Sequence, residues 1–121
     1  MSSKELLNAL NELKADRRMP TEIKAIIDPL RRQKFLLELI FVSATRTFGN
    51  RFDSYYDNGY TALCKTKQGD FEVSVMFSAI ENEPIAAREP GDVFDAQVTL
   101  LDFDGLYQRA VLGHSIEDVV P

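Results

Sequence analysis

The sequence contains one cysteine, one histidine and no tryptophan. A single cysteine, Cys64, excludes an internal disulfide, which agrees with a reducing compartment. Cys64 and the only histidine, His114, are too few ligands for a structural zinc site built from four such side chains. Neither a glycine-rich phosphate loop nor a Gly-x-Ser-x-Gly motif occurs. We therefore expect a protein that is not an enzyme and needs no cofactor or metal.

Long apolar runs are also missing. The most apolar stretch, 35–44, is interrupted by Glu38 and is far shorter than the roughly 20 residues that span a bilayer. The first ten residues contain Glu5 and Asn8, whereas a signal peptide needs a positive patch followed by an apolar region. These features predict an unprocessed cytoplasmic protein without membrane contact.

Positive charge is scarce in the second half of the chain. The net charge is −5, but residues 1–68 hold 12 Lys/Arg against 8 Asp/Glu, and residues 69–121 hold 2 against 11. This balance disfavours a strongly basic nucleic-acid binder, which needs clustered cations to neutralise phosphates. One basic group lies in or between the predicted helices, where we expect it to face solvent or pair with carboxylates. Its members are Arg17, Arg18, Arg31, Arg32 and Lys34.

The N-terminal third has the periodicity of two short helices. The segment from Ser2 to Glu5 is typical of a capping box, and a stripe of leucines follows it at helical spacing. The stripe is Leu6, Leu10 and Leu13. It either packs against the rest of the chain or meets the same stripe of a second subunit in a homo-oligomer. A second helix, with Thr21 as its N-cap, is predicted before Pro29.

From Phe35 onwards the pattern changes to strands. Alternation and turn residues predict five of them, with a bend or bulge in the long first one and a short helix or two turns at 78–89. The fourth strand follows a turn at Glu89–Asp92, and Asp104-Gly105 predicts a two-residue hairpin before the fifth. The predicted strands are 35–48, 60–67, 71–77, 93–103 and 106–112.

Five strands with a helical break between the third and the fourth match an oligonucleotide/oligosaccharide-binding (OB) barrel. The stretch from Phe71 to Leu112 resembles the end of an OB-fold domain of the tRNA-anticodon-binding-like type. In that type an alternating third strand leads through a helix to a Pro-Gly-Asp-x-hydrophobic turn, here Pro90-Gly91-Asp92-Val93-Phe94. The competing folds are an SH3-like barrel and a curled antiparallel sheet with helices on one face.

The expected architecture is therefore mainly β, and α+β overall. Two N-terminal helices (residues 1–34) precede an OB-like barrel (35–115), and a short flexible tail (116–121) completes one structural domain.

The segment 49–60 is unusually rich in aromatic residues, with arginines nearby. In an OB fold this loop joins the first two strands and borders the ligand face. Rings there stack on bases, and arginines contact phosphates. One alternative is that the rings form a protein-binding patch. The other is that they fold back onto the barrel and cover its open end, with their hydroxyls reaching water. The predicted ligand-binding residues are Arg46, Arg51, Phe52, Tyr55, Tyr56 and Tyr60.

The remaining polar residues do not form a convincing catalytic or metal site. The acidic pairs Asp53/Asp57 and Asp102/Asp104 lack the ligand spacing of a calcium loop and are interpreted as turn residues. A Cys64–His114 dyad lacks an orienting third group. We therefore expect a non-enzymatic binding domain that works through protein contacts. The alternative is weak binding of single-stranded nucleic acid through the loop 46–60.

Overall fold

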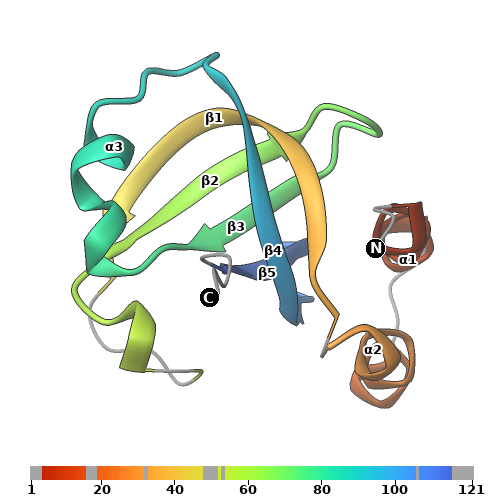
Figure 1. The fold of residues 1–121 in the computed structure, drawn as a ribbon. Coiled ribbons are helices and arrows are strands. Elements are labelled where there is room, and N and C mark those ends of the chain that lie inside the picture. Colours follow the sequence, from red (N-terminus) through yellow and green to blue (C-terminus); the bar gives the residue numbers. More distant parts are fainter. Residues whose placement is uncertain are drawn as a thin grey trace.

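A computed structural model describes residues 4–15, 19–31, 33–47, 52, 54–105 and 107–115. Over these residues the structure is a mixed α+β fold in which three helices accompany a five-stranded sheet (Figure 1). Three short 3₁₀ turns lie between them: η1 (Asp28–Leu30), η2 (Ser54–Tyr56) and η3 (Ala79–Glu81). The helices are α1 (Lys4–Ala15), α2 (Pro20–Ile27) and α3 (Asn82–Ala86). The strands are β1 (Phe35–Arg46), β2 (Tyr60–Thr66), β3 (Glu72–Met76), β4 (Val93–Asp104) and β5 (Arg109–His114).

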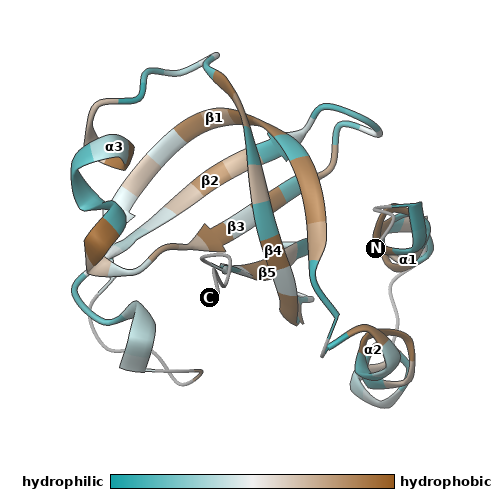
Figure 2. Ribbon diagram, in the orientation of Figure 1, coloured by the Kyte–Doolittle hydropathy of each residue, from teal (hydrophilic) through white to brown (hydrophobic). Residues whose placement is uncertain are grey.

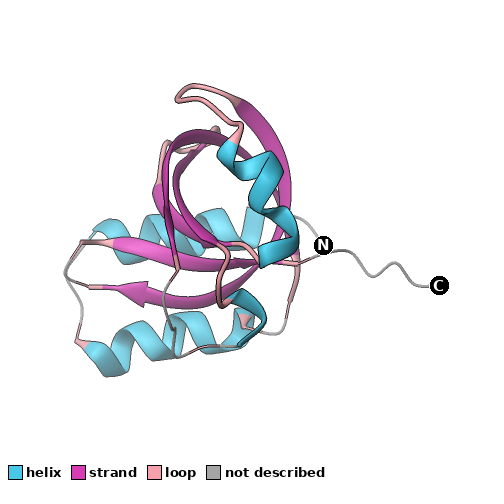
Figure 3. Ribbon diagram, turned by 90° about the vertical axis from the view of Figure 1, so that its left-hand side faces the viewer, coloured by secondary structure: helices cyan, strands magenta, loops and turns pink. Residues whose placement is uncertain are grey.

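The sheet closes on itself in the order β1-β2-β3-β5-β4, because β4 pairs back with β1. Strands β3 and β5 are parallel, and every other pairing is antiparallel. The register of β1 against β2 shifts between Phe41 and Ser43, and that of β4 against β5 between Leu100 and Asp102. Bulges bend a strand and increase its twist, which lets the long strands β1 and β4 curve around the core (Figure 3).

Side chains alternate between the inside and the outside of this closed sheet, as the period of two in a strand requires. Apolar and polar positions accordingly alternate in Figure 2 along β1 and β4. Helix α3 lies at one end of the strands, and α1 lies beyond the other end (Figure 1). Ile85 of α3 is buried in the same core cluster as the inward-facing residues of the strands. Both ends of the core are thus covered by helix.

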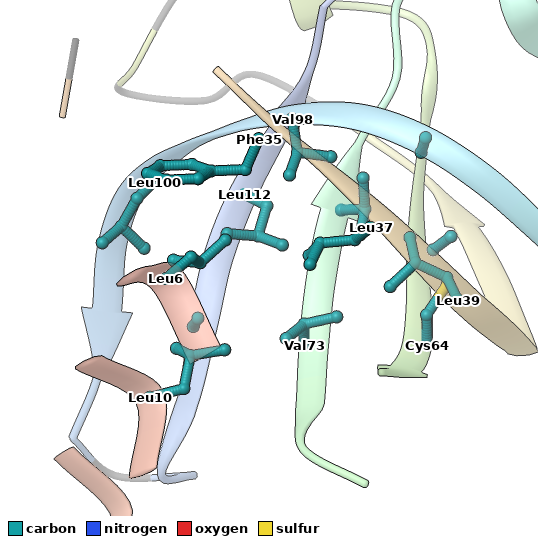
Figure 4. Packing of buried hydrophobic residues seen from close by; sticks show 14 of the residues in the cluster. Leu6, Leu10, Phe35, Leu37, Leu39, Cys64, Val73, Val98, Leu100 and Leu112 are labelled. Atoms are coloured by element: carbon teal, nitrogen blue, oxygen red, sulfur yellow. The ribbon is translucent and has the colours of Figure 1, made fainter. Parts of the chain in front are cut away.

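The leucine stripe of α1 is part of this core. Leu6, Leu10 and Leu13 are at most 2% exposed, and Figure 4 shows Leu6 and Leu10 directed at the inner side chains of the strands, such as Leu112. The stripe therefore packs against its own chain, which is the first of the two predicted alternatives. This burial disfavours the homo-oligomer contact predicted through these three leucines, which stays a prediction.

The N-cap predicted for the second helix is also wrong. The N-cap is Met19 rather than Thr21, with Pro20 at the first helical position. Proline fits there because that backbone N–H has no helical partner in any case. The Glu22 carboxylate accepts a hydrogen bond from the Met19 N–H at 2.9 Å. The predicted capping box at Ser2, Ser3 and the tail 116–121 lie outside the described residues.

The connection between β4 and β5 differs from the predicted two-residue hairpin. Residues 105–108 connect the strands, and Gln108 has a left-handed backbone with φ 55°. The Asp104 carboxylate accepts the Tyr107 N–H at 3.2 Å, and the Gln108 amide donates to the Gly105 carbonyl at 2.7 Å. These two bonds lie within the connection itself, and β5 begins at Arg109 instead of residue 106.

Among the described residues, no helix has the length and apolar character needed to cross a membrane.

Candidate functional site

Some of the predicted site residues are exposed to solvent, and others pack against the surface of the barrel. Arg46, at the end of β1, is exposed, and its guanidinium lies 5.4 Å from the ring centroid of the half-buried Tyr60. Its Nη2 also donates to the Asn58 carbonyl at 3.4 Å. These contacts bring Arg46 and Tyr60 together, but the Arg46 guanidinium then occupies one face of the Tyr60 ring. Arg51 lies outside the described residues.

The two adjacent tyrosines of η2 point to different environments. Tyr55 is 40% exposed, whereas Tyr56 is only 7% exposed. Their rings meet edge to face at a centroid distance of 5.2 Å, a favourable geometry for aromatic pairs. Phe52 is half-buried. The Tyr56 ring therefore folds back, but it lies on the backbone of Gly113 rather than with its hydroxyl in water, and Tyr55 is the exposed ring of this pair.

Beside this loop, the outward-facing side chains of β2, β3 and β5 form a surface that we call the outer wall. Leu63 pairs with Ser74, and Ser74 pairs with Val111, so these three residues form its middle row. This row is half-buried and mostly apolar. The rows on either side differ: one carries charges, and in the other Tyr56 covers Gly113. The outer wall comprises Thr61, Leu63, Lys65, Glu72, Ser74, Met76, Arg109, Val111 and Gly113.

The charged row of the outer wall adjoins the β4–β5 turn. Arg109 donates from Nη2 to the Glu72 carboxylate at 2.9 Å, and its guanidinium lies 5.1 Å from the ring centroid of Tyr107. Tyr107 is 61% exposed. The sequence prediction missed this cluster because it placed Tyr107 inside the fifth strand. Arg109 at the start of a strand, two residues after a tyrosine, was the available signal.

The cysteine offers no nucleophile. Cys64 is completely buried in the core, and burial raises the pKa of its thiol to about 12, with Arg88 opposing the shift. A thiol with so high a pKa does not ionise at neutral pH, and the thiolate is the reactive form. A Cys64–His114 dyad would therefore lack its activated member.

His114 lies at the end of β5 near η3 and α3. Its ring stacks against Phe77 at a centroid distance of 4.8 Å, and its Nδ1 is buried without a hydrogen-bond partner among the described residues. Burial lowers the pKa of His114 from its ordinary value of 6.5, and the negative charge of Glu81 acts in the opposite direction. The folded protein therefore favours the neutral imidazole at this position.

This environment predicts a loss of stability in acid. When the pH falls below 6.5, the unfolded chain takes up a proton on His114 that the folded protein resists, so the free energy of unfolding decreases until the folded-state pKa is reached. Urea unfolding of the wild type and of His114→Phe at pH 7.5 and pH 5.5 measures the effect. The wild type should lose more stability than the variant, which keeps an aromatic ring against Phe77. Equal losses would contradict the prediction.

A separate cavity of about 460 Å³ lies between α2 and the β4–β5 turn. Its apolar lining includes Ile23, Ile27 and Phe103. Two cations at its rim, Lys24 and Arg31, both pair with Asp28, at 3.3 and 3.0 Å. The sequence prediction that the basic residues pair with carboxylates is confirmed for Arg31. These pairs belong to one short segment, so they do not bridge the basic and acidic halves of the chain.

Within the described ranges, no three His, Cys, Asp or Glu side chains lie close enough together to hold a metal ion. Comparison of the chain with models of known protein families, with curated protein sequences and with solved structures finds no match.

Proposed function

We propose that the chain is a non-enzymatic cytoplasmic binding domain with an OB-like barrel, and that it binds another protein through the outer wall. The strand order, the parallel β3–β5 pair and the helix between β3 and β4 support the OB-like assignment. In that architecture the faces of the second and third strands, with the loops flanking them, bind the ligand.

The observation that carries the protein-binding proposal is the composition of the outer wall. Its middle row is mostly apolar, with Leu63 and Val111 on either side of Ser74. The wall is flanked by two exposed tyrosines, Tyr55 and Tyr107. Protein interfaces are enriched in tyrosine and arginine around a desolvated centre. This surface has that composition on a small scale.

The charges of the wall favour a protein over a nucleic acid. Arg109 is paired with Glu72 at 2.9 Å, and Lys65 stands opposite the same glutamate in the β2–β3 register. Arg109 also faces Asp104 across β5 and β4. The row is therefore close to neutral. Nucleic-acid binding requires an excess of cations to replace the counterions of the phosphates.

Photocrosslinking tests this proposal. A photoreactive benzoylphenylalanine at Lys65, an exposed position of the wall, should give a discrete protein adduct in cells that express the chain. The same residue at Glu22, which is exposed on α2 and is not part of the wall, is the control and should give none. Equal labelling from both positions, or no adduct from either, would reject a protein partner at the wall.

Binding of single-stranded nucleic acid is the second candidate function, favoured by Arg46 and Tyr55 at the surface of one loop. Titration of a short labelled oligothymidylate at low salt distinguishes it. We expect no binding. Binding that weakens steeply with added salt, and that is lost in Arg46→Ala and Tyr55→Ala, would replace the protein-binding proposal with this one.

A further inference from the structure

Tyr56 fills a gap in the outer wall. A side chain at Gly113 would point outward from β5, because Leu112 before it faces the core. A Cβ atom built there would overlap the Tyr56 hydroxyl oxygen and lie 2.7 Å from the ring carbon Cζ. The phenol therefore lies directly on the bare backbone of Gly113. The φ of Gly113 is not positive, so the missing side chain makes room for the ring and is not needed for an unusual backbone.

The neighbouring residues complete a slot around this ring. Leu101 of β4 has its Cδ1 3.1 Å from the position of that Cβ. Met76 of β3 pairs with Gly113 and also faces outward, yet it is only 5% exposed, so the wall is covered at this point. We call Gly113 with its neighbours Leu101 and Met76 the Tyr56 slot.

The loop that carries Tyr56 is anchored independently of the ring. The Thr47 N–H donates to the Gly59 carbonyl at 2.8 Å, and the Asn82 amide donates to the Asn58 carbonyl at 3.0 Å. The accepting carbonyls belong to Asn58 and Gly59, which follow Tyr56 in the chain. The two bonds hold the loop where it enters β2. Neither of these two bonds involves the ring of Tyr56.

We propose that the Tyr56 slot is the recognition site for a tyrosine side chain of the protein partner, and that Tyr56 occupies it in cis until the partner displaces it. The chemistry of the occupant is taken from the structure, since a tyrosine ring already fits the slot in size and polarity. The inference rests on the proposed function, because the slot belongs to the same outer wall. Self-occupancy reduces the apparent affinity for the partner by the fraction of molecules whose slot is open.

The test uses the purified chain and N-acetyl-tyrosinamide, which carries the tyrosine side chain between two peptide-like groups. NMR titration of Tyr56→Ala should show binding with chemical-shift changes at Gly113 and Leu101. The affinity should be at least about tenfold higher than that of the wild type, whose slot is filled. Tyr55→Ala is the matched control: it removes the neighbouring exposed ring and should bind no better than the wild type.

A double variant tests whether the binding occurs in the slot. In Tyr56→Ala/Gly113→Ala the new methyl group occupies the space of the phenol, so binding should return to the wild-type level. Binding that survives in the double variant, absence of binding in a folded Tyr56→Ala, or failure of Tyr56→Ala to fold would each overturn the proposal. The last result would show that the ring cannot leave the folded protein.

Nitration by tetranitromethane provides a second measurement. Exposed phenols react, so Tyr55 and Tyr107 should be nitrated in the wild type and Tyr56 protected. Gly113→Ala should expel the ring and make Tyr56 as reactive as Tyr55; continued protection would overturn the slot. Both experiments use the isolated chain. The slot can therefore fail while the Lys65 crosslink succeeds, or the reverse, which separates this inference from the proposed function.

Discussion

Replacement of Gly59 by alanine is expected to destabilise the protein by about 3 kcal/mol, because nothing near this glycine can move aside. A Cβ atom at Gly59 would overlap the backbone carbonyl oxygen of Phe77 and lie 2.9 Å from the carbonyl carbon of Ser78. A flexible side chain could rotate away from a new methyl group, but these atoms belong to the backbone that leaves β3. The chain must therefore shift or the loop must detach.

The position of Gly59 explains why such a shift is costly. Its carbonyl accepts the Thr47 N–H at 2.8 Å, and the next residue, Tyr60, accepts the Phe77 N–H at 2.9 Å. A displacement of Gly59 therefore strains the junctions of the loop with both β1 and β3 at once. These are the same junctions that hold Tyr55 and Tyr56 beside the outer wall.

Gly105→Ala is the matched control for this prediction. The nearest atom to a Cβ there is Ile23 Cδ1 at 3.9 Å, an ordinary contact. Neither glycine has a positive φ, so backbone strain does not distinguish them. Urea unfolding should place Gly105→Ala within about 0.5 kcal/mol of the wild type. If the two variants were equally stable, the close approach of Gly59 to the end of β3 would be refuted.

The sequence was most informative where a local rule determines the structure. Alternating side chains located β3 and β4 to within a residue or two, because a strand with one buried face must repeat with a period of two. The length of the first strand required a bend, and a bulge is found between Phe41 and Ser43. The proline and glycine of the turn before β4 also predicted it correctly, and Gly91 there has φ 97°.

Features that depend on tertiary contacts were not predictable in this way. Asp104-Gly105 is a strong local signal for a two-residue turn, but side-chain hydrogen bonds from Asp104 and Gln108 stabilise a longer connection. Gly113 carried no signal, since it follows the predicted fifth strand (106–112), and even within a strand a glycine has several explanations. Only the position of Tyr56, distant in sequence, shows why a side chain is absent there.

The leucine stripe of α1 leads to the second large prediction. Leu6→Ala should lower the free energy of unfolding by about 3 kcal/mol, because the side chain is fully buried and its removal leaves a cavity in the core. Leu36→Ala is the matched control, since the same atoms are removed from a leucine that is 58% exposed on β1. That variant should stay within about 0.5 kcal/mol of the wild type.

The same pair of variants decides between the two roles of the stripe. If α1 closes the end of its own barrel, Leu6→Ala should unfold at lower urea concentration at every protein concentration, and its mass by light scattering should equal that of the wild type. If the stripe were a subunit contact, the loss of stability would depend on protein concentration, and the mass would fall. The burial of Leu6 beside inner residues of β4 and β5, such as Leu100 and Leu112 (Figure 4), leads us to expect the first result.

Because α1 closes the core at the end of the strands where β5 begins, its docking also supports the strand that carries Arg109, Val111 and Gly113. Loosening of α1 in Leu6→Ala should therefore increase amide hydrogen exchange in β5 more than Leu36→Ala does.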